Sequence, residues 1–144
     1  MKHPVENNPQ PSEARTLSDT LSVTLALLCT AAYIVLCFLF AKDAESVGAL
    51  LVIMLLWFPA LPVITVTELI HRFTASAPRR RTIELVGLLL SAAGSLLMSG
   101  FWLLMILQGG NKMIPMGMTV IAVNAAAILL LWSKRKIVHK RGET

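Results

Sequence analysis

The sequence predicts an all-α membrane protein, a bundle of four transmembrane helices with both chain ends in the cytoplasm. Hydrophobic residues make up 56% of the 144 residues, and the mean hydropathy is +0.70. A soluble domain seldom exceeds about half apolar residues. The apolar residues also fall into four blocks of 20 or more, each long enough to cross a hydrocarbon core about 30 Å thick.

The blocks define the elements in chain order. A polar segment, residues 1–20, contains three prolines and is expected to be a cytoplasmic tail, with Ser18 or Asp19 capping the first helix. The first block is too long for the apolar core of a signal peptide, so we expect an uncleaved anchor. The predicted spans of the transmembrane bundle (21–132) are 21–40, 47–70, 83–107 and 113–132, followed by a basic cytoplasmic tail, 133–144.

Two prolines interrupt the second predicted span. Proline lacks a backbone donor, so Pro59 and Pro62 are expected to free the carbonyls of Leu55 and Phe58. Lipid offers these carbonyls no partner. Broken helices at this depth form substrate sites in many transporters, but kinks satisfied by neighbouring helices are commoner. We therefore expect a structural kink, with a functional site as the alternative.

Polar residues of the other spans lie at a similar depth. Thr30, Ser95 and Asn124 are near the middle of the first, third and fourth spans. With Pro59 and Pro62 they define a candidate polar midplane layer. The layer is expected to hold helices together through hydrogen bonds, because a side-chain amide in hydrocarbon needs a partner. None of these groups is ionisable, which argues against proton coupling.

Small residues recur every four positions in the third span and predict a helix-packing seam. Such a column lies along one helix face and lets another backbone approach closely. Its partner is open between the second span, the fourth span and a second copy of the chain. The seam consists of Gly87, Ser91, Ser95 and Ser99.

Charge predicts the orientation. Of the 13 Lys and Arg residues, eleven fall in the tails and the middle loop, and only Lys42 and Lys112 lie on the other side. Cytoplasmic loops carry such an excess, so both termini are predicted to be cytoplasmic. Trp102 and Trp132 are then expected at opposite membrane faces.

A cytoplasmic charge cluster is predicted where the second and third spans meet their loop. Its carboxylates are expected to pair with nearby arginines close to water, and the arginines to contact anionic lipid head groups. The alternative is a cytoplasmic gate or a docking site for a partner. The cluster consists of Glu68, Arg72, Arg79, Arg80, Arg81 and Glu84.

Several function classes are excluded by what the sequence lacks. Its three histidines lie outside the spans or at their ends, and no Cys, His and carboxylate group has metal-ligand spacing. There is no phosphate loop and no serine in a nucleophile turn. The net charge of +5 has no basic domain to carry it, which argues against nucleic acid. We expect a protein that is not an enzyme and binds no cofactor and no metal.

In length and topology the chain resembles several groups of small four-span membrane proteins, such as small multidrug exporters. Those exporters carry a glutamate in their first span, and this chain has none there. We expect a non-catalytic accessory or interaction subunit of a bacterial inner membrane, packed against itself or another membrane protein. The alternative is a homo-oligomeric transporter or channel subunit with a path at Pro59 and Pro62. A membrane-embedded charge would discriminate, and its absence favours the first class.

Overall fold

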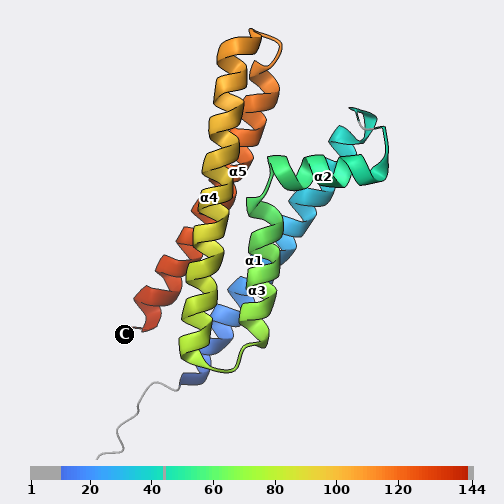
Figure 1. Ribbon diagram of the computed structural model, residues 1–144. Helices are drawn as coiled ribbons and strands as arrows, with labels where there is room; N and C mark the ends of the chain where they lie inside the picture. Colours follow the sequence, from blue (N-terminus) through green and yellow to red (C-terminus); the bar gives the residue numbers. More distant parts are fainter. Residues whose placement is uncertain (1–10, 44, 143–144) are drawn as a thin grey trace, which may run out of the picture.

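The computed structural model describes residues 11–43 and 45–142 (Figure 1). Its elements are helices throughout: α1 (Pro11–Phe40), the short 3-10 helix η1 (Ala41–Asp43), α2 (Val47–Trp57), α3 (Ala60–Phe73), α4 (Ala77–Gly109) and α5 (Ile114–Gly142). Within these residues α1, α4 and α5 are long and apolar enough to cross a membrane. The all-helical membrane class is therefore confirmed.

The second predicted span is not one kinked helix. It divides into α2 and α3, which meet at 83°. Pro59 precedes α3, and Pro62 lies in the first turn of α3, where a backbone N–H has no intrahelical acceptor and proline costs little. The carbonyl of Phe58, expected to be free, accepts from the N–H of Leu61 at 3.3 Å. The prolines thus begin a new helix instead of bending an old one.

The outer helices extend further than their apolar blocks. Helix α1 begins at Pro11, so Ser18 and Asp19 lie inside it and the expected capping role is wrong. Helix α5 continues to Gly142, which makes residues 133–142 of the expected tail helical. Residues 1–10 and 143–144 of the expected tails lie outside the described residues.

The helices gather their polar ends at one end of the molecule. Helices α4 and α5 form an antiparallel hairpin, whose turn contains Gly110 at a φ of +69° that favours glycine. Helix α3 packs between α1 and α4. In Figure 1 the beginnings of α1 and α4 and the ends of α3 and α5 lie at the same end, while α2 extends sideways from the bundle.

Aromatic rings fasten the break between α2 and α3. The ring of Trp57 packs edge-on against Phe40 of α1, with centroids 5.5 Å apart, and against Trp102 of α4, at 5.1 Å. Trp102 is buried inside the protein, and its expected position at a membrane face stays a prediction. The sharp turn at the break brings Trp57 beside it. Trp132 is exposed on α5.

The seam of small residues on α4 faces the bundle interior. A Cβ on Gly87 would lie 2.8 Å from the hydroxyl oxygen of Thr67 in α3 and 2.9 Å from its Cβ, so a side chain there would force Thr67 to shift. Ser91 and Ser95 are buried, and Ser99 is half-buried. Of the three packing partners left open, the structure thus places α3 against the start of the seam.

Candidate functional site: a buried ionic cluster

One lysine of α5 joins four helices at the polar end of the bundle. The ammonium of Lys134 contacts the carboxylate of Glu68 in α3, and donates to the hydroxyl of Ser22 in α1 at 2.8 Å. It also lies 3.6 Å from the carboxylate of Glu84 in α4. An ammonium has three donors and no acceptor, so it hydrogen-bonds to Glu68 and Ser22 and lies within ion-pair distance of Glu84.

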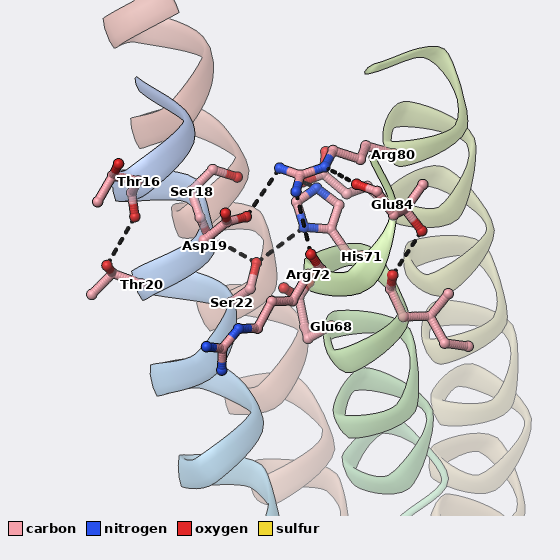
Figure 2. A network of polar contacts seen from close by, with 12 residues as sticks. Thr16, Ser18, Asp19, Thr20, Ser22, Glu68, His71, Arg72, Arg80 and Glu84 are labelled. Carbon is pink, nitrogen blue, oxygen red and sulfur yellow. Dashed lines mark hydrogen bonds and ion pairs between the residues drawn. The ribbon is translucent and has the colours of Figure 1, made fainter. Parts of the chain in front are cut away.

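A histidine completes the cluster. His71 of α3 places Nε2 3.0 Å from a carboxylate oxygen of Glu84, and Nδ1 3.2 Å from the hydroxyl oxygen of Ser22 (Figure 2). A carboxylate accepts hydrogen bonds, so Nε2 carries a proton. We call Ser22, Glu68, His71, Glu84 and Lys134 the ionic cluster.

The ionic cluster is shielded from solvent. Relative exposure is 2% for Glu68, 3% for His71 and 5% for Lys134, and 18% for the side chain of Glu84. Charges taken out of water are costly unless they are paired and hydrogen-bonded. Every member is paired, and Glu84 forms the edge nearest water.

An arginine clamp lies beside the ionic cluster. Arg80 of α4 forms an ion pair with Asp19 of α1, with nitrogen and oxygen 3.0 Å apart (Figure 2). The same guanidinium donates to the carbonyls of Thr74 at 2.5 Å and Arg72 at 3.3 Å. One side chain therefore holds α1 to the turn between α3 and α4.

A cavity of about 10 Å³ adjoins the carboxylates and the ammonium. That is about the space one water molecule needs. Its lining consists of Glu68, Glu84, Leu88, Leu131, Lys134 and Arg135. In the part of the chain that the structure describes, no group of three His, Cys, Asp or Glu side chains could hold a metal ion. The arrangement is suited to holding and exchanging protons.

The predicted charge cluster is rearranged in the structure. Glu68 was expected to pair with Arg72 near water, and Glu84 with the neighbouring arginines. Instead Glu68 pairs with Lys134, and Glu84 with His71 and Lys134. Helix packing brings these partners together away from water, where attraction between charges is stronger than at an exposed surface. The exposed members of the predicted cluster are Arg72, Arg79 and Arg81.

Sequence reasoning assigned Lys134 to the tail and missed its role. Lys134 begins a basic run after an apolar block, which suggests a solvated end. The signal that finds it is periodic: Asn124, Ala127 and Leu131 are buried at alternating spacings of three and four, and the next step is Lys134. Ser22 and His71 were likewise not singled out for this site.

The candidate midplane layer is brought together in part. The side-chain amide of Asn124 donates to the carbonyl of Trp57 at 2.8 Å. Ser95 lies beside it, with its hydroxyl 3.5 Å from the amide oxygen of Asn124. The carbonyl served is thus that of Trp57, not that of Leu55 or Phe58, because the chain turns sharply at this point.

Thr30 belongs to a different contact. Its hydroxyl donates to the carbonyl of Ala26 at 2.8 Å and lies 3.4 Å from the hydroxyl of Thr65 in α3. Around the two prolines the interior is filled, since Phe58 and Ile64 are completely buried. The hydrogen bonds of this layer therefore link α4 and α5 to the break between α2 and α3.

Comparison with known proteins gives no match: neither a family model, nor a curated protein, nor a solved structure matches the chain significantly. The function is therefore argued from the arrangement of side chains alone.

Proposed function

We propose that the chain crosses a bacterial inner membrane four times, with α2 and α3 together forming the second crossing. Helix α3 has 14 residues, about 21 Å, and is too short to cross alone. The shared end of the bundle carries the middle loop and the start of α1 and end of α5 (Figure 1). Its excess of basic residues supports a cytoplasmic position for that end and for both termini.

We further propose that the protein is a non-catalytic interaction subunit that docks on another membrane protein, or on a second copy of itself, through α2. The observation that carries this is the composition of α2. Its 11 residues, from Val47 to Trp57, include no charged or hydrogen-bonding side chain except the indole of Trp57, and Met54 is its one buried residue.

A helix of this kind is poorly matched to lipid alone. Eleven residues span about 16 Å, which is half of a hydrocarbon core. A helix that lies along the membrane surface normally turns a polar face to water, and α2 has none. The turn before it carries Lys42 and Glu45, which need water and hold this end near the surface. Docking covers the apolar side chains that face away from the bundle: Leu51, Val52, Leu55 and Leu56.

Site-specific photo-crosslinking in native membranes tests the docking. A photoreactive residue at Leu55 should give a discrete protein adduct, and co-expression of two differently tagged copies tells a second copy from another protein. The matched control is Leu97 of α4, which is exposed on a spanning helix and should crosslink mainly to lipid. Leu55 adducts that contain only lipid would refute docking through α2.

The second candidate function, a homo-oligomeric transporter with its path at Pro59 and Pro62, is favoured by the ionic cluster. The cluster places charges inside the bundle, a feature that the sequence did not reveal. The filled interior at Phe58 and Ile64 argues against a path there. A thermal-shift screen of common ions and metabolites should compare the wild type with the Pro59→Ala/Pro62→Ala variant. A ligand that stabilises only the wild type would favour transport.

A further inference from the structure

Ser22 has one hydroxyl proton and two acceptors within reach of it. Its oxygen lies 2.9 Å from the carbonyl oxygen of Ser18 and 3.2 Å from Nδ1 of His71. The same oxygen accepts from the ammonium of Lys134 at 2.8 Å. Because an ammonium can only donate, the hydroxyl proton points either to Ser18 or to His71.

Each choice corresponds to one protonation state of His71. If the hydroxyl donates to Nδ1, the imidazole is neutral, with its proton on Nε2 facing Glu84. If the hydroxyl donates to Ser18, Nδ1 must itself donate to Ser22, and the imidazole is positively charged. In the first state the carbonyl of Ser18 still accepts a hydrogen bond from the backbone N–H of Ser22, as in any regular α-helix. Rotation of one O–H bond thus satisfies both states.

We infer that the ionic cluster is a binding site for a single proton, taken up at Nδ1 of His71 against the hydroxyl of Ser22. Imidazole is the side chain whose unperturbed charge change lies near neutral pH. This site is independent of docking through α2, which lies on the other side of the helix break.

One added proton balances the charge of the ionic cluster. With a neutral imidazole, the two carboxylates Glu68 and Glu84 exceed the ammonium of Lys134 by one negative charge, and the proton makes the cluster neutral. An unbalanced charge is costly where solvent is excluded. Of the neighbouring groups, Asp19 of α1 and Arg80 of α4 neutralise each other. Arg135 of α5, which lines the cavity, opposes uptake from the exposed side.

Glu84 provides the route for the proton. Its side chain is the most exposed of the cluster, it adjoins the water-sized cavity, and it lies 3.0 Å from Nε2 of His71. Nε2 already carries a proton, so Nδ1 takes its proton from the Ser22 hydroxyl, and the Ser22 oxygen takes one in turn from the ammonium of Lys134 at 2.8 Å. Lys134 then regains a proton from the Glu84 carboxyl, 3.6 Å away, which water has protonated. Proton exchange therefore needs no opening of the bundle.

The test is an NMR titration of the full-length chain in phospholipid nanodiscs, with ¹⁵N-labelled histidine. His3→Gln and His139→Gln leave His71 as the single imidazole of a chain with three histidines. Between about pH 5 and 9 the expected change is from two protonated nitrogens to a neutral ring protonated at Nε2. A constant protonation state throughout, or a neutral ring protonated at Nδ1, would overturn the proposal.

A variant pair tests the part played by the hydroxyl. Ser22→Ala should lower the proton affinity of His71 about tenfold, one pH unit in the titration midpoint, because an imidazolium loses a stronger hydrogen bond than a neutral ring loses. The control is Thr24→Ala, also in α1, whose exposed hydroxyl donates to the carbonyl of Thr20 at 2.9 Å. Its midpoint should equal that of the parent.

Equal midpoints for Ser22→Ala and its control would remove the hydroxyl from the site. Circular dichroism and gel filtration establish that each variant is folded. If Ser22→Ala does not fold, Glu84→Gln replaces it, because loss of the nearest negative charge should also lower the proton affinity of His71. The titration of the parent decides between binding and no binding in every case.

Discussion

Removing the ammonium from the ionic cluster should destabilise the protein severely. Lys134→Met keeps most of the apolar stem but leaves the carboxylate of Glu68, which is 2% exposed, without its ion-pair partner. Breaking a buried ion pair from one side typically costs about 3–5 kcal/mol. Ser22 loses a donor as well, and Glu84 keeps only His71. We therefore expect a loss of about 4 kcal/mol in the free energy of unfolding.

The assay is reversible denaturation in mixed micelles, monitored by helical circular dichroism. The double variant Lys134→Met/Glu68→Leu should recover most of the loss, because apolar replacement of both partners is often neutral or stabilising. The matched control is Lys136→Met, the same change two residues later, where the ammonium lies 5.1 Å from the ring centroid of Trp132. That exposed contact contributes about 0.5–1 kcal/mol. If the losses in unfolding free energy caused by Lys134→Met alone and Glu68→Leu alone simply add up in the double variant, the pairing is refuted.

Three further predictions concern the packing and the orientation. Gly87→Ala should lower the free energy of unfolding by about 1–3 kcal/mol, because its Cβ would lie 2.8 Å from a hydroxyl oxygen of α3. The control is Gly100→Ala in the same helix, where a Cβ meets nothing within 4 Å and the change should be neutral or stabilising. Chemical denaturation measures both. Asn124→Leu should cost about 1–3 kcal/mol, because the carbonyl at the helix break loses its donor; Thr119→Val, which alters an exposed hydroxyl, should cost little in the same assay. A reporter that is active only outside the cytoplasm should be silent when fused after Thr144, and full activity there would contradict the proposed orientation.

The helical class and three of the long helices follow from the apolar blocks, since a run of 20 such residues has few alternatives to a spanning helix. The two prolines located the interruption at the correct place. They did not reveal the angle of 83° between α2 and α3. A missing backbone donor permits a kink or a new helix start, and the choice depends on distant side chains, here the rings of Phe40 and Trp102 that pack on Trp57.

The sequence pointed to two of the five residues of the ionic cluster. Glu68 and Glu84 stood out because they are acidic and lie at the ends of apolar blocks. Their partners could not be inferred, because the pairing depends on how four helices are rotated against one another. Charge counting placed Lys134 in the tail, although its position in the buried repeat of α5 identifies it once the helix is known to continue.

The ion pair between Glu68 and Lys134 joins residues that are 66 positions apart, which has a consequence for synthesis. A ribosome completes α3 and α4 well before the lysine emerges, so the nascent chain holds a carboxylate with no counter-charge between its helices. Once synthesised, and until α5 packs, the lysine adds to the positive charge of the end that the proposed orientation places in the cytoplasm. Only when α5 packs does this charge leave water and close the bundle. A chain cut short before α5 is therefore expected to stay loosely assembled and open to membrane proteases. Packing of α5 is then the step that completes assembly and protects the chain from degradation.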